Sequence, residues 1–103
     1  MIKVSVLYPH VEAYRFDMDY YVSRHVAMIR ELLGDALIRC EIDQGVCGSA
    51  PASTPPFVAA VHMYFDSTDA FYTAFGPHAR TINKDVANYT DIRPTMQVSS
   101  VLS

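Results

Sequence analysis

The chain has 103 residues, of which half are hydrophobic and 18% are charged, so we expect one globular domain over residues 1–103. The net charge of −3 and the scatter of the eight Lys and Arg residues argue against a nucleic-acid or anionic-membrane surface. No apolar run approaches the roughly 20 residues of a membrane-spanning helix. The N-terminus lacks the features of a signal peptide, and we therefore expect a cytoplasmic protein.

The first third of the chain predicts a strand followed by a helix. Side chains alternate over residues 2–8, and Pro9 ends this strand. Asp17 is a suitable N-cap for a helix that runs to about residue 33, where Gly34 offers a left-handed C-terminal residue. The three- and four-residue spacing predicts a buried stripe made of Met18, Tyr21, Val22, His25, Ile29, Leu32 and Leu33.

The middle of the chain predicts two strands separated by a long loop. Alternation over residues 36–43 indicates a half-exposed strand, and residues 45–56 are rich in Gly, Ser and Pro, as expected of a loop. Residues 57–65 are apolar almost throughout, which is typical of a central strand covered on both faces.

The last third predicts a second helical region and a final strand. Asp66 or Ser67 can cap a helix that ends at Gly76-Pro77, with Phe71, Ala74 and Phe75 turned inward. A short helical stretch with Ala79, Ile82 and Val86 on one side leads through a polar loop to a strand over residues 95–102.

The order of the elements predicts an α+β fold of the ferredoxin-like βαββαβ type, with one antiparallel sheet and both helices on one face. The other face would then expose Met63 and Phe65, or their alternates on the same strand. Burying that face against a second copy of the chain is the simplest remedy, so we expect a homodimer.

His25 is the candidate for chemistry that the sequence singles out. It lies four residues after Tyr21 and four before Ile29, so it points toward the sheet. A histidine titrates near neutral pH and can move a proton of a bound molecule, with Tyr21 orienting the ring or the substrate. The alternative is a core histidine satisfied by one backbone or tyrosine partner.

The other histidines and the cysteines predict no metal site. His62 lies in the central strand and could face the same cavity as His25 or the dimer interface. No pair of histidines has metal-ligand spacing, and no phosphate-binding loop or nucleophile elbow is present, so we expect no metal and no cofactor. Cys40 and Cys47 match no redox pair and should be free thiols.

Eleven of the tyrosine and phenylalanine residues are spread over the predicted elements, which suits either a core or a pocket for a flat apolar molecule with some polar groups. Asp85 and Asn88 bracket the turn before the last strand, where turn-forming side chains are common. Both residues are candidates for substrate binding, as is His62.

Several segments, taken together and in order, resemble the EthD family, within the dimeric α+β barrel superfamily. The segments are Val6-Leu7-Tyr8-Pro9; Phe16-Asp17; Tyr20-Tyr21 followed by His25; Tyr64-Phe65-Asp66-Ser67; Ala74-Phe75-Gly76-Pro77-His78; and Asp85 through Ile92 with Pro94. The resemblance implies a ferredoxin-like subunit that pairs through its sheet into a barrel. It also implies that the helix histidine of the family is His25, and that the aspartate and asparagine of its late loop are Asp85 and Asn88.

The resemblance leaves three readings of the function open, one of which is an oligomer-forming accessory protein with no ligand. The first is a cofactor-independent isomerase, cyclase or monooxygenase-type enzyme that acts on a small cyclic or aromatic catabolic intermediate, with His25 transferring a proton. The second is a non-catalytic accessory protein that binds a small apolar metabolite, with His25 only as a hydrogen-bond partner. The expected partners are a second copy of the chain and such a ligand.

Overall fold

The alternating segments of the sequence form four antiparallel strands in the computed structural model, which describes residues 1–103. The strands are β1 (Ile2–Pro9), β2 (Arg39–Gln44), β3 (Phe57–Phe65) and β4 (Thr95–Ser100). Their order in the sheet is β2-β3-β1-β4, so β1 and β3 lie side by side in the middle, and each helical region connects one of these central strands to an edge strand. This is the predicted ferredoxin-like topology.

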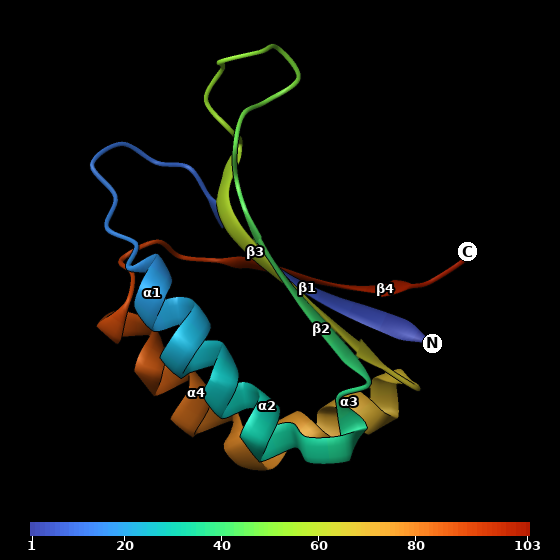
Figure 1. The fold of residues 1–103 in the computed structure, drawn as a ribbon. Coiled ribbons are helices and arrows are strands. Elements are labelled where there is room, and N and C mark those ends of the chain that lie inside the picture. Colours follow the sequence, from blue (N-terminus) through green and yellow to red (C-terminus); the bar gives the residue numbers. More distant parts are fainter.

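Two helical regions cover one face of the sheet (Figure 1). The first runs without a break from α1 (Met18–Tyr20) through a π-helical segment (Tyr21–Val26) into α2 (Ala27–Leu33). The second consists of α3 (Thr68–Phe75) and α4 (Ala79–Asp85). Short 3₁₀ turns follow α2, α3 and α4 at residues 34–36, 76–78 and 86–88.

The helix ends follow the predicted capping residues. The Asp17 carboxylate accepts a hydrogen bond from the backbone N–H of Tyr20, and the Ser67 hydroxyl accepts one from the N–H of Ala70. Gly34, with φ of 56°, ends α2 in a conformation that favours glycine.

The π-helical segment changes which residues of the first helix are buried. The prediction that Val22 belongs to the buried stripe was wrong: its side chain is 46% exposed, whereas Val26 is 1% exposed. A π-turn holds one residue more than an α-turn, and the buried side of the helix after Tyr21 therefore includes both His25 and the following Val26. Tyr21, His25, Ile29 and Leu33 are buried as predicted.

Two strands have a boundary that differs by more than one residue from the sequence prediction. The strand expected over residues 36–43 is Arg39–Gln44, because a 3₁₀ turn occupies residues 34–36. The last strand ends at Ser100 rather than at residue 102. Cys40 on β2 and Cys47 in the following loop are both free thiols, as predicted.

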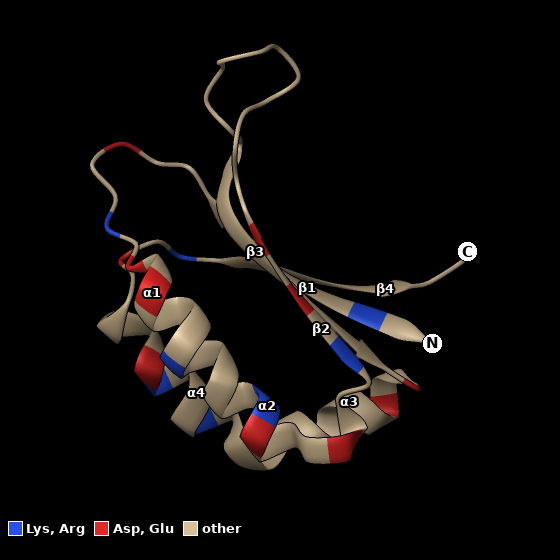
Figure 2. Cartoon of the chain, viewed as in Figure 1, with Lys and Arg blue, Asp and Glu red and all other residues tan.

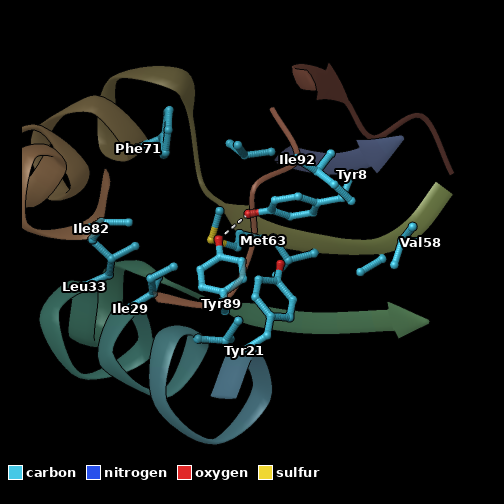
Figure 3. Close-up of a cluster of buried hydrophobic side chains, with 14 of the residues drawn as sticks. Tyr8, Tyr21, Ile29, Leu33, Val58, Met63, Phe71, Ile82, Tyr89 and Ile92 are labelled. Atoms are coloured by element: carbon cyan, nitrogen blue, oxygen red, sulfur yellow. Dashed lines mark hydrogen bonds between the residues drawn. The ribbon is translucent and has the colours of Figure 1, made fainter. Parts of the chain in front are cut away.

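The core lies between the helices and the sheet. Val4 of β1 pairs with Met63 of β3, and both side chains are buried beneath the helices together with Phe65. Figure 3 shows the side chains of this core, contributed by strands, helices and the segment before β4.

The other face of the sheet carries no helix, so within one chain β3 is covered by helices on one face only. Because Met63 and Phe65 face the helices, their alternates His62 and Tyr64 lie on this open face. The register places the following residues there: Lys3, Ser5, Leu7, Arg39, Glu41, Asp43, Ala60, His62, Tyr64, Thr95, Gln97 and Ser99. The open face is therefore mostly polar.

Charged side chains of both signs are intermingled over the surface. Figure 2 shows Lys and Arg scattered among Asp and Glu along the helices and strands, without a patch of one sign. None of the helices has the length and apolar character that crossing a membrane requires.

Candidate functional site

A cavity of about 210 Å³ lies between the helices and the sheet. Residues of both helical regions and of β1, β3 and β4 surround it. We call it the helix–sheet cavity; its lining consists of Val6, Tyr8, Tyr21, His25, Ile29, Val61, Met63, Phe71, Phe75, Ile82, Asn83, Val86, Pro94 and Met96. The lining contains no Asp, Glu, Lys or Arg, so the cavity suits an apolar ligand.

His25 lies in the π-helical segment and is 3% exposed. Its Nδ1 donates a hydrogen bond to Oδ2 of Asp85 over 2.8 Å. The other ring nitrogen, Nε2, has no hydrogen-bond partner within the chain. Because Nδ1 is held by a carboxylate, Nε2 is the nitrogen available to a molecule in the cavity. π-helical turns are often found at functional sites.

Asp85 is held in place by two further donors. The Tyr20 hydroxyl donates to Oδ1 over 2.7 Å, and the side-chain amide of Asn88 donates to the same oxygen over 2.9 Å. Partial burial acts to raise the pKa of Asp85, but the hydrogen bonds from Tyr20, Asn88 and His25 outweigh it and lower that pKa below its ordinary value. Asp85 is therefore ionised at neutral pH.

The protonation state of His25 is set by two opposing effects. Burial disfavours the imidazolium and lowers the pKa of His25, whereas the hydrogen bond and the charge of Asp85 act to raise it. Burial is the larger effect, so the pKa lies below its ordinary value of 6.5. At neutral pH the pair consists of an ionised Asp85 and a neutral His25 with its proton on Nδ1.

Tyr21 lies against His25 on the cavity wall. The two rings stack, with centroids 5.8 Å apart and planes 16° apart. The Tyr21 hydroxyl is fully buried and has no hydrogen-bond partner. Burial raises the pKa of Tyr21 far above its ordinary value, so the hydroxyl keeps its proton and can act as a donor.

Tyr8 and Tyr89 complete the aromatic cluster around Tyr21. Their hydroxyls are hydrogen-bonded to each other, and Figure 3 shows the Tyr21 ring beside this pair. The Tyr89 ring also contacts His25, with a centroid distance of 4.6 Å. Burial raises the pKa of both Tyr8 and Tyr89. Neutral aromatic rings of this cluster thus pack against the His25 ring.

The structure brings four of the five predicted site residues together. His25 and Tyr21 line the cavity, whereas Asp85 and Asn88 support His25 without lining it. His62 lies on the open face of the sheet, so it does not share the cavity of His25. Its ring nitrogens are paired with the Ser5 hydroxyl over 2.8 Å and with Asp43 over 3.1 Å.

Sequence reasoning did not single out Tyr20, Tyr8 or Tyr89. Tyr20 lies next to Tyr21 within one of the segments of the family resemblance, which is the signal that could have found it. Its partner Asp85 is 65 residues away, a distance over which the sequence gives no contact information. No group of three or more His, Cys, Asp and Glu side chains is placed to hold a metal ion.

The chain matches a family model described as the EthD domain over residues 12–93. Among solved structures it is similar to an EthD-like protein from Ralstonia eutropha JMP134, with 43% identity, a TM-score of 0.94 and coverage of 99% of this chain and 92% of that chain. An ethyl tert-butyl ether D family protein from Bacillus halodurans C-125 is 19% identical, with a TM-score of 0.75 and 99% of each chain covered. A dimeric ferredoxin-like protein of unknown function from Thermobifida fusca YX is 16% identical, with a TM-score of 0.60 and coverage of 97% and 90%. None of the curated proteins matches the sequence.

Proposed function

The chain belongs to the EthD family, and we propose that it is a cofactor-independent enzyme that moves a proton on a small cyclic or aromatic intermediate of bacterial catabolism. One observation carries the proposal: a neutral His25, tied through Nδ1 to Asp85, keeps Nε2 free beside an apolar cavity. A general base needs a lone pair within reach of the substrate and a pKa that leaves it unprotonated at working pH. His25 meets both requirements.

Four side chains have separate roles in the proposed proton transfer. Nε2 of His25 takes a proton from the bound molecule, and the resulting imidazolium is stabilised by the ionised Asp85. Tyr20 and Asn88 hold Asp85 in the position that fixes the tautomer of His25. Return of the proton to another atom of the substrate completes an isomerisation or a cyclisation. The same deprotonation would be the first step of a monooxygenase-type reaction.

Exchange of carbon-bound hydrogen in D₂O tests the proposal without knowledge of the natural substrate. We expect the protein to accelerate deuterium exchange at the carbons next to the carbonyl of cyclohexanone, followed by NMR. His25→Ala should abolish the acceleration, and the matched control His10→Ala, at an exposed loop position, should retain it. Equal acceleration by His25→Ala and the wild type would refute the role of His25.

The second candidate function is a non-catalytic accessory protein that binds a small apolar metabolite. The apolar lining of the helix–sheet cavity favours it. The same experiment separates the two functions, because an accessory protein would bind cyclohexanone without accelerating exchange.

We also propose that the protein is a homodimer paired through the open face of the sheet, and that it resides in the cytoplasm. The uncovered face and the dimeric state of the similar Thermobifida fusca protein support the dimer. Two free cysteines are consistent with a reducing compartment.

A further inference from the structure

The helix–sheet cavity selects against charged molecules. None of its 14 lining residues carries a formal charge at neutral pH, and the nearest ionised group behind His25 is the carboxylate of Asp85. A carboxylate or phosphate in this cavity would lose its hydration without gaining a cationic partner, and Asp85 would repel it. A cationic ligand would likewise have no carboxylate in direct contact. The occupant is therefore a neutral molecule.

The unpartnered hydroxyl of Tyr21 identifies the polar group of that molecule. It is the one fully buried side-chain nitrogen or oxygen atom in the chain that has no hydrogen-bond partner. The neighbouring Tyr8, which also lines the cavity, is already paired with Tyr89. A buried hydroxyl without a partner costs stability, and a ligand oxygen that accepts its hydrogen bond would remove that cost.

The size of the cavity limits the ligand to one ring. A dry cavity of about 150 Å³ lined by aliphatic and aromatic side chains is known to hold benzene. The volume here is about 210 Å³. This is below the roughly 300 Å³ at which pockets for drug-sized ligands begin. A six-membered ring with one or two small substituents fits this range.

The rings of Tyr21 and His25 stack, and both residues line the cavity, so one small ligand can contact both side chains. We infer, as a refinement that rests on the proposed function, that the substrate is a neutral, single-ring ketone whose carbonyl oxygen accepts from the Tyr21 hydroxyl while His25 takes a proton from the adjacent carbon. The C–H bond breaks, its electron pair forms a carbon–carbon double bond, and the proton goes to Nε2. The carbonyl becomes an enolate oxygen that accepts a hydrogen bond from Tyr21, which keeps its proton. Where the ring also carries a carbon–carbon double bond conjugated with the enolate, return of the proton from Nε2 to the far carbon of that system gives an isomer.

Ligand binding measured by protein NMR tests this inference with three single-ring probes. Cyclohexanone offers an acceptor, methylcyclohexane offers none, and benzoate is an anion. We expect Tyr21→Phe to weaken cyclohexanone binding about tenfold, the effect of one hydrogen bond of about 1.4 kcal/mol. Methylcyclohexane should bind Tyr21→Phe as it binds the wild type, and benzoate should bind neither protein. Tyr72→Phe, at an exposed position on α3, is the matched control.

The result separates the substrate class from the catalytic role of His25. Unchanged cyclohexanone affinity in Tyr21→Phe, tighter binding of benzoate than of cyclohexanone, or failure of cyclohexanone to bind the wild type would overturn the inference. Tyr21-dependent binding of cyclohexanone without deuterium exchange would uphold the ligand class and the Tyr21 contact, and it would overturn the proton transfer to His25 and with it the enzymatic function.

Discussion

His25 and Asp85 show how burial and a carboxylate can act against each other on one imidazole. Burial keeps the ring neutral, and Asp85 fixes which nitrogen carries the proton. A histidine that only fills space would need no such orientation. The predicted consequence is a base that is ready at neutral pH and becomes inactive only in acid.

The first prediction concerns the pH dependence of deuterium exchange. Because the pKa of His25 lies below 6.5, the rate should be constant at neutral pH and fall only at lower pH, where Nε2 becomes protonated. The stability of the fold should fall in the same range, since the unfolded chain binds that proton more readily. A rate that is already falling between pH 8 and 7 would contradict the assignment.

Asp85→Asn gives the second prediction. Removing the charge lowers the pKa of His25 further, so the acid limb of the profile should move to lower pH. The rate should fall by about 10²–10⁴-fold, because the tautomer of His25 is no longer fixed and the imidazolium loses its counter-charge. Asp91→Asn, a carboxylate that bonds only the backbone of Arg15, is the control and should leave the profile unchanged.

The third prediction compares two buried tyrosines of the same cluster. Tyr8→Phe leaves the Tyr89 hydroxyl without its partner and should lower the free energy of unfolding by about 1–3 kcal/mol. Tyr21→Phe removes a hydroxyl that has no partner and should leave that free energy unchanged or raise it. Chemical denaturation of both variants measures the difference. A large loss in Tyr21→Phe would mean that its hydroxyl is already satisfied.

At the scale of single residues, the sequence predicted the direction of His25 but not its surroundings. Spacing from Tyr21 and Ile29 was sufficient to place it toward the sheet. The hydrogen bond from His25 to Asp85 joins residues 60 positions apart, and the hydrogen bond between Tyr8 and Tyr89 joins residues 81 positions apart. Such contacts depend on the packing of whole elements, and no local pattern encodes them.

At the scale of elements, capping residues and alternation predicted nearly every helix and strand. The π-helical segment was missed, because its residues have ordinary helix-forming character and only the burial of Val26 in place of Val22 reveals it. The start of β2 was missed because residues 36–38 are apolar like a strand, although the 3₁₀ turn of Gly34–Ala36 reaches the first of them. Helix type and turn type are decided by tertiary contacts in both cases.

The fourth prediction concerns the loop that begins after β2. A Cβ atom added to Gly45 would lie 2.0 Å from the backbone oxygen of Phe57, so Gly45→Ala should lower the free energy of unfolding by about 1–3 kcal/mol. Gly76→Ala, where no atom lies within 4 Å, should be neutral or slightly stabilising. Similar melting temperatures for the two variants would contradict this prediction, because they would mean that the backbone moves to make room for the added methyl group at residue 45.

At the scale of the whole molecule, the fifth prediction is a dimer. The open face presents Ser5, His62 and Tyr64 beside the charged side chains of β2, so a partner copy would bury hydrogen-bonded polar groups as well as apolar ones. A stable interface should bury at least roughly 1,000 Å² in total. Sedimentation at micromolar concentration should report twice the mass of the chain, and a single monomeric species would contradict the pairing.

The cavity itself is a property of the assembled molecule. Its lining residues come from β1, β3, β4 and both helical regions. Which residues line it depends on which face of the sheet packs against the helices. The sequence predicted the topology, and hence that a space between the layers is possible, but its volume depends on side-chain packing across the layers.

The most direct test of the central claim is ¹⁵N NMR of the His25 ring at pH 7. A neutral ring with its proton on Nδ1 has one protonated and one unprotonated nitrogen, and added cyclohexanone should change the signal of the unprotonated Nε2 in particular. We predict this pattern, with full protonation only well below pH 6.5. A ring that is doubly protonated at pH 7, or one with its proton on Nε2, would contradict the proposal that His25 is the base.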